Sequence, residues 1–240
     1  MKVLIFDTKA QAIARVVEVI SRQLRNKGDS VLGLATGGTM EPVYAGLIAA
    51  YTEGLVEFSR ATTFNLDEYV GLPADHACSY ASFMRQRLFS QVDMDLARAH
   101  LPNGTAADPA LEAQRYEAAI ERAGGIDLQL LGIGENGHIG FNDPPAQPSD
   151  PTRVLNLSQS SIETGIKSWG SRQATPTQAI SAGMAQLLGA KEIVLIVSGS
   201  HKRDILRQSL RGPLTPNVPA SYLQQSANVT VIADRAAWTE

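Results

Sequence analysis

Short apolar runs alternate along the chain with longer segments in which apolar residues recur every three or four positions. The apolar runs predict strands at 3–6, 31–35, 62–66, 126–133, 192–198 and 229–233. The helical periodicity predicts helices at 8–28, 42–51, 79–89, 109–122, 177–188 and 201–210. This repetition of strand, helix and strand predicts an α/β fold, with an open, mainly parallel, Rossmann-like sheet and helices on both of its faces.

One segment, 145–176, departs from the regular pattern. It begins with a proline-rich stretch and continues with weakly patterned polar residues. A long irregular segment inside a compact domain is often a lid over a functional site. We therefore expect a single α/β domain over residues 1–240 with a lid around 145–176, and a surface insertion is the open alternative.

Composition narrows the classes of partner. The chain has 240 residues and a net charge of -3, which gives no positive surface for nucleic acid or for an anionic membrane. No apolar run reaches membrane-spanning length, so we expect no membrane partner and a cytoplasmic location. The single cysteine, Cys78, excludes an internal disulfide and has no evident base beside it, so we expect it to be structural.

In parallel sheets of this kind, ligands bind beyond the carboxyl ends of the strands. The loop after the second predicted strand contains Thr36, Gly37, Gly38 and Thr39 and precedes a helix. Free backbone N–H groups, a helix N-terminus and two hydroxyls are typical of a phosphate-binding loop. It lacks the lysine and spacing of a Walker A loop, and a plain turn is the alternative explanation.

A lysine in the first turn of a helix opposes the helix dipole unless an anion binds there. Lys202 occupies such a position, directly after the strand predicted at 192–198. We interpret Lys202 as a second phosphate contact, with a solvated surface lysine as the alternative.

Two adjacent acids, Asp67 and Glu68, follow the third predicted strand. Adjacent side chains diverge, so one acid can line a cleft while the other makes a structural contact. An acid at the carboxyl end of a strand is a candidate general base. A helix cap or a solvated acid is the alternative for either residue.

The sequence GENGHIGFNDP, at 134–144, follows the most apolar predicted strand. It contains Asn136, His138, Asn142 and Asp143 within eight residues. An imidazole beside a carboxylate is well suited to moving protons near neutral pH. The chain has no HExxH motif and no Cys/His pairing, so we predict no metal site.

With these loops defined, the chain resembles the glucosamine-6-phosphate deaminase family. The matching blocks occur in the order and spacing of the family and span nearly the whole chain: LGLATGGT (32–39), TFNLDEYVGL (63–72), SYASFM (79–84), LGIGENGHIGFNDP (131–144) and VSGSHK (197–202). The blocks around Asp67 and His138 are specific, whereas related lactonases and sugar-phosphate sensors have loops similar to 36–39.

The resemblance implies conversion of glucosamine 6-phosphate and water to fructose 6-phosphate and ammonia, without a cofactor. It implies that His138, oriented by Asp143, opens the sugar ring, and that Asn136 belongs to the same catalytic loop. It implies that Asp67 moves a proton from C2 to C1. The expected partner is a small aminosugar phosphate, and the protein is expected to be a monomer or a small homo-oligomer.

For the substrate phosphate, the resemblance implies contacts from residues 36–39, from Lys202 and from Lys167 in the lid. Three positions depart from the usual family pattern. Asn136 stands where some members have an aspartate, Asp143 replaces a glutamate, and Lys167 stands where an arginine usually binds the phosphate.

These departures affect substrate identity more than reaction class. A galactosamine-6-phosphate deaminase/isomerase is the nearest alternative, followed by a 6-phosphogluconolactonase and then by a non-catalytic sugar-phosphate sensor. The block at 67–72 argues against the lactonase. The absence of a basic segment and the presence of both Asp67 and His138 argue against the sensor.

Overall fold

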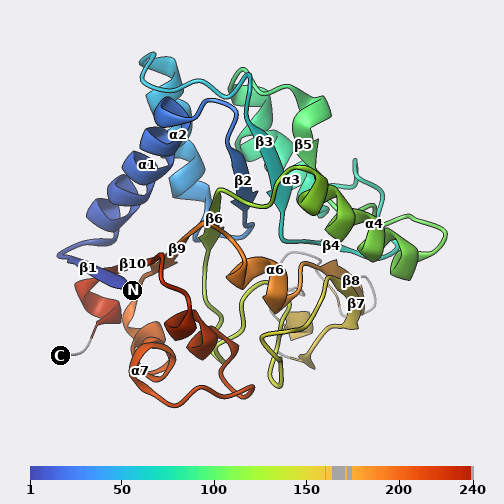
Figure 1. Cartoon of the computed structure of the whole chain (residues 1–240). Helices are drawn as coiled ribbons and strands as arrows, with labels where there is room; N and C mark the ends of the chain where they lie inside the picture. Colours follow the sequence, from blue (N-terminus) through green and yellow to red (C-terminus); the bar gives the residue numbers. More distant parts are fainter. Residues whose placement is uncertain (160, 164–170, 172–174, 239–240) are drawn as a thin grey trace.

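The computed structural model describes residues 1–159, 161–163, 171 and 175–238. Its main element is a seven-stranded sheet in the order β1-β10-β9-β6-β2-β3-β5, in which every neighbouring pair is parallel (Figure 1). The strands are β1 (Lys2–Phe6), β2 (Val31–Leu34), β3 (Thr62–Asn65), β5 (Ala99–His100), β6 (Leu128–Leu131), β9 (Glu192–Val197) and β10 (Val229–Asp234). The predicted α/β class with a mainly parallel sheet is confirmed.

Helices connect and cover these strands. The α-helices are α1 (Lys9–Asn26), α2 (Glu41–Thr52), α3 (Tyr80–Arg87), α4 (Pro109–Arg122), α6 (Met184–Leu188) and α7 (Arg203–Arg211). Short 3₁₀ helices occur at Phe89–Gln91, Leu96–Arg98, Ser200–Lys202, Pro219–Gln225 and Arg235–Ala237. Thr8 starts α1 with a capping box, in which its hydroxyl and the Gln11 side chain each accept from the other's backbone N–H. No helix in the described residues is long and apolar enough to cross a membrane.

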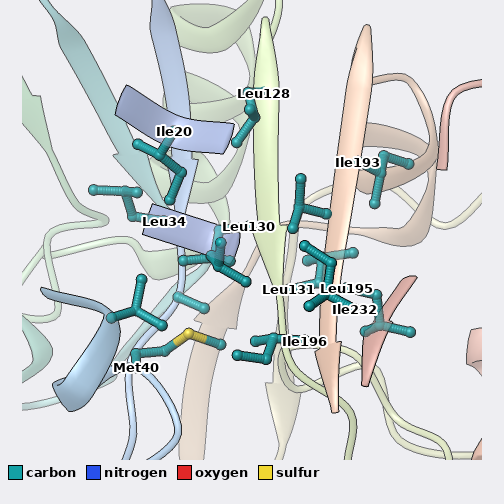
Figure 2. Packing of buried hydrophobic residues seen from close by; sticks show 14 of the residues in the cluster. Ile20, Leu34, Met40, Leu128, Leu130, Leu131, Ile193, Leu195, Ile196 and Ile232 are labelled. Atoms are coloured by element: carbon teal, nitrogen blue, oxygen red, sulfur yellow. The ribbon is translucent and has the colours of Figure 1, made fainter. Parts of the chain in front are cut away.

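The core lies between the central strands and the helices packed on them. All four residues of β6 are buried, as expected for a parallel strand covered on both faces. Figure 2 shows side chains of β6, β9 and β10 packed with Ile20 of α1 and with Met40. This rigid centre fixes the carboxyl ends of the strands, where the loops of interest begin.

A second, three-stranded antiparallel sheet has the order β4-β8-β7 (Figure 1). Its strands are β4 (Asp67–Tyr69), β8 (Gln178–Ser181) and β7 (Arg153–Asn156). β4 follows β3 after a single residue, and β7 lies inside the segment expected to be irregular. The small sheet therefore connects the end of β3 to residues far along the chain.

The helix predicted at 177–188 is wrong in its first half. Residues 178–181 form β8, and only Met184–Leu188 is helical. The apolar spacing there fits a helix, but β8 pairs with β4 on one side and with β7 on the other, and this tertiary pairing overrides local propensity. The strand predicted at 62–66 likewise stops at Asn65, before β4 begins.

At the amino end of the sheet, a buried carboxylate joins separate elements. Asp127 accepts hydrogen bonds from Lys27 Nζ at 2.6 Å, from the Val31 backbone N–H at 2.8 Å and from Lys191 Nζ at 2.8 Å. Burial raises the pKa of Asp127, but the hydrogen bonds from Lys191 and Lys27 outweigh it and leave the pKa below its usual value. The charged form of Asp127 is therefore favoured by folding.

We expect Asp127→Asn to lower the free energy of unfolding by about 1–2 kcal/mol at pH 7, because the variant loses the charge that both lysines contact. The loss is modest because both lysines remain partly hydrated. Since the folded pKa is depressed, this stability is present above the unfolded pKa of about 4 and is lost as the pH falls through the folded value. Urea unfolding at several pH values measures the difference between wild type and variant. A difference that stays constant from neutral to strongly acidic pH would contradict this account.

Candidate active site

The candidate site lies at the carboxyl ends of the central strands. The strands that follow β2 in the sequence, β3 and β5, lie on one side of it in the sheet. The strands that follow β6, namely β9 and β10, lie on the opposite side. The strand order therefore reverses between β2 and β6, which is where open α/β sheets bind ligands. The loops that follow β2, β6 and β9 contain the predicted phosphate contacts and the His138 loop.

Asp67 is the first residue of β4 and is 6% exposed. The backbone of Gly140 approaches it closely: a Cβ at Gly140 would lie 3.4 Å from Asp67 Oδ2 and 3.3 Å from Ser181 Oγ. Gly140 also has a positive φ of 60°, which favours glycine. The His138 loop and the Asp67 carboxylate are thus brought together.

The Asp67 carboxyl is poised to hold a proton at neutral pH. Burial raises its pKa to about 8, and the negative charge of Glu68 adds to the shift. In the described part of the chain, no lysine, arginine or histidine contributes an opposing shift. A carboxyl with a pKa near the working pH is suited to act as a general base and then as a general acid.

Glu68 takes the structural role among the two adjacent acids. Its carboxylate accepts from the backbone N–H groups of Tyr69 at 2.9 Å, Tyr80 at 3.1 Å and Ala81 at 2.9 Å. The last two groups belong to the first turn of α3, where backbone N–H groups have no partner within the helix. Glu68 therefore joins β4 to α3 and leaves Asp67 as the acid beside the His138 loop.

His138, Asp143 and Asn136 form a compact polar group after β6. His138 Nδ1 lies 3.0 Å from Asp143 Oδ1, and Asn136 Nδ2 donates to the same oxygen at 2.8 Å. Asn136 Oδ1 accepts from the His138 backbone N–H at 3.2 Å. The aspartate, although shorter than a glutamate, reaches the imidazole.

The environment of Asp143 is the opposite of that of Asp67. Burial raises the pKa of Asp143, but the adjacent His138 imidazole and its charge, the hydrogen bond from Asn136 and the Ser158 hydroxyl bring it down to about 2. Asp143 is therefore ionised at neutral pH. A fixed negative charge 3.0 Å from Nδ1 orients the ring.

Gly134 fixes the position of the imidazole ring. A Cβ at residue 134 would lie 2.2 Å from His138 Cε1, and the Gly134 N–H donates to the His138 carbonyl at 2.9 Å. Any side chain at residue 134 would therefore occupy the space of the ring.

The loop after β2 leaves its backbone open. A Cβ at Gly37 or Gly38 would meet no atom within 4 Å in the described residues, and Gly37 has a φ of 100°. The side chain of Thr36 hydrogen-bonds to the Tyr80 hydroxyl, while Thr39 is half-buried at the end of the loop. This open backbone just before α2 has the form expected of an anion site.

Lys202 ends the 3₁₀ helix Ser200–Lys202, immediately before α7. Burial lowers its pKa, and the negative charge of Glu135 partly offsets the shift, so Lys202 lies near the His138 loop. Asp234 fixes the preceding turn by accepting from the Gly199 N–H at 3.1 Å. Lys167, the remaining predicted phosphate contact, lies outside the described residues.

Several side chains near the site were not predicted from the sequence. Tyr69, Tyr80 and Phe141 form an aromatic cluster, with ring centroids 4.9 Å apart for the two tyrosines and 5.7 Å apart for Tyr69 and Phe141. The pKa of Tyr80 is raised by burial and next by the charge of Asp67, which places Tyr80 beside the candidate base. All three residues lie in the sequence blocks at 63–72, 79–84 and 131–144 that carry the family resemblance, and their place in these blocks could have identified them.

Within the described residues, no three His, Cys, Asp or Glu side chains are grouped so as to hold a metal ion. The metal-free and cofactor-free reaction remains a prediction. The acids and the imidazole that are present fit proton transfer.

The family model described as glucosamine-6-phosphate isomerases/6-phosphogluconolactonase matches residues 7–232. The chain belongs to this family. A curated glucosamine-6-phosphate deaminase of Rhodopirellula baltica is 50% identical over 226 residues, covering 94% of this chain and 90% of the relative. One from Cellvibrio japonicus is 43% identical over 237 residues, covering 99% and 90%.

Solved members of the glucosamine-6-phosphate isomerase/6-phosphogluconolactonase family share the architecture. A monomeric glucosamine-6-phosphate deaminase superposes with a TM-score of 0.96 at 38% identity, covering 99% of this chain and 98% of its own. The 6-phosphogluconolactonase from Trypanosoma cruzi superposes with a TM-score of 0.80 at 18% identity, covering 98% and 95%. The second likeness shows a common fold alone.

We expect Gly134→Ala to lower kcat by roughly 10-fold or more, because displacing the imidazole removes part of an acid–base contribution of about 10²–10⁴. Circular dichroism should show a retained fold. Gly28→Ala is the matched control, since a Cβ there makes ordinary contacts at 3.9 Å. Unchanged turnover in Gly134→Ala would mean that the ring position is not important for the reaction.

Proposed function

We propose that this protein is a glucosamine-6-phosphate deaminase, which converts glucosamine 6-phosphate and water to fructose 6-phosphate and ammonia. The observation that carries the proposal is the buried Asp67 carboxyl facing the loop of the His138–Asp143 pair. Curated relatives with this activity are 40–50% identical over nearly the whole chain.

The first step is the opening of the pyranose ring. The proton of the C1 hydroxyl leaves and the ring oxygen gains a proton, which gives the open-chain aldehyde. His138 is the group for this transfer, because Asp143 holds its Nδ1 side and leaves the other ring nitrogen for the substrate. Asn136 supports the pair through its bond to Asp143.

The second step is proton transfer between carbons. Asp67 removes the proton from C2 while a proton of the substrate ammonium passes to the C1 oxygen, which gives an enolamine. Asp67 then returns its proton to C1, which gives a protonated ketimine at C2. Water adds to the ketimine, ammonia leaves, and fructose 6-phosphate remains. The nitrogen of the substrate serves in the ketimine, so no lysine Schiff base and no cofactor are required.

The charge of the substrate complements the environment of Asp67. The protonated amino group at C2 is a cation, and an opposite charge nearby favours the ionised carboxylate. A sugar lactone would bring no such cation. This argument favours an aminosugar over the substrate of a 6-phosphogluconolactonase, and the presence of both Asp67 and His138 argues against a non-catalytic sensor.

The phosphate is assigned to the backbone and hydroxyls of residues 36–39, to Lys202 and to Lys167. These groups supply binding and orientation rather than chemistry. A single charge-assisted hydrogen bond of this kind contributes about 1.5–3 kcal/mol. We propose glucosamine 6-phosphate rather than galactosamine 6-phosphate as the substrate, because the curated relatives are glucosamine-6-phosphate deaminases.

The remaining expectations belong to the same proposal. The protein acts in the cytoplasm on amino sugars released in catabolism. It consists of one domain with a lid. A monomeric state is supported by the relative that superposes over 99% of the chain and is monomeric.

Incubation with glucosamine 6-phosphate should release ammonia and fructose 6-phosphate in equal amounts. Asp67→Asn should abolish turnover while leaving the fold intact, because an amide cannot take the C2 proton. Galactosamine 6-phosphate and 6-phosphogluconolactone, assayed in parallel, distinguish the alternatives. Turnover of the lactone without ammonia release from either aminosugar would refute the proposal, and substantial turnover by Asp67→Asn would remove Asp67 from its role.

A further inference from the structure

The Asp143 carboxylate is held through both of its oxygens. Oδ1 faces His138 Nδ1 at 3.0 Å and accepts from Asn136 at 2.8 Å. Oδ2 accepts from the hydroxyl of Ser161 at 3.1 Å. The partners on Oδ1 come from the loop after β6, whereas Ser161 comes from the segment after β7, 18 positions along the chain.

Ser161 is itself held in place. Its backbone N–H donates to Ser158 Oγ at 3.2 Å, and the Ser158 hydroxyl donates to Ser161 Oγ at 3.1 Å. The Ser158 hydroxyl is also close enough to Asp143 to help lower the pKa of that carboxyl, but its single proton serves one acceptor at a time. The Ser161 hydroxyl accepts from Ser158 and donates to Oδ2, and so links this short turn to a carboxylate that faces the imidazole with its other oxygen.

The second oxygen decides where the first one points. Rotation of an aspartate about χ2 is broad and roughly two-fold, so the carboxylate plane is poorly defined by the side chain alone. The hydrogen bond from Asn136 to Oδ1 tolerates a range of carboxylate orientations, so it does not fix the plane. A donor on Oδ2 from a separate element fixes the plane, and with it the direction from Oδ1 to Nδ1.

We propose that Ser161 is a positioning residue, which sets the carboxylate plane of Asp143 and through it the orientation of His138. The kinetic consequence rests on the proposed function, but the orientation of the imidazole does not. Ser161 makes the segment after β7 a part of the ring-opening machinery, although it contributes no group that touches the substrate.

The first test is kinetic. We expect Ser161→Ala to lower kcat with glucosamine 6-phosphate by roughly 10-fold, a fraction of the acid–base contribution of about 10²–10⁴. KM should stay within about 2-fold of the wild-type value, because the phosphate contacts are elsewhere. The reverse reaction from fructose 6-phosphate should lose less, since it depends less on opening an aldose ring.

Two matched variants separate positioning from a general structural effect. Ser161→Thr keeps the hydroxyl and should restore kcat to within about 2-fold of wild type. Glu163→Ala removes a side-chain hydrogen bond in the same segment, to Gln159 at 2.6 Å, and should leave kcat unchanged. An equal loss in Ser161→Thr and Ser161→Ala, or an equal loss in Glu163→Ala, would overturn the proposal.

The second test needs no substrate. The chain has four histidines, so the imidazole ¹H and ¹⁵N resonances can be resolved, and His138→Gln assigns those of His138 by their disappearance. Ser161→Ala should shift the His138 resonances, while Ser161→Thr and Glu163→Ala should not. If Ser161→Ala leaves them in place, Ser161 does not position the ring, whatever the enzyme turns over. If they shift and glucosamine 6-phosphate is not a substrate, the positioning stands and the proposed function fails.

Discussion

The Asp67 carboxyl is buried at the start of β4 and meets no opposing charge in the described part of the chain, so its pKa rises to about 8. Folding has to hold this unfavourable group in place. The pairing of β4 with β8 fixes its backbone, Glu68 anchors the next residue to α3, and Gly140 leaves room for its oxygens. The small antiparallel sheet and the tight loops around the site follow from this constraint.

Asp143 gives the complementary case within the same site. Donors surround it, and its pKa falls to about 2, so it stays ionised while Asp67 can exchange a proton. Carboxyl groups whose environments push their pKa values apart take different roles in acid–base chemistry. Here the ionised Asp143 orients an imidazole, and Asp67 is the carboxyl available to exchange a proton with substrate carbon.

The sequence predicts the parallel sheet well because each of its main strands is a short apolar run between amphipathic helices. It does not predict the small sheet, because β7 and β8 are four residues long and their pairing with β4 overrides the local pattern. Asp67 and His138 were predictable, since each follows a strand in a block rich in polar residues. The contact of Ser161 with Asp143 depends on tertiary folding, which no periodicity records.

The central claim is that Asp67 is a carboxyl whose proton is held by burial. Carboxyl ¹³C labelling of the aspartates, followed by NMR across a pH titration of the substrate-free protein, measures this directly. The account predicts one carboxyl carbon that titrates near pH 8 and is absent from Asp67→Asn. A resonance assigned to Asp67 that titrates near 4, the ordinary value for aspartate, would contradict it.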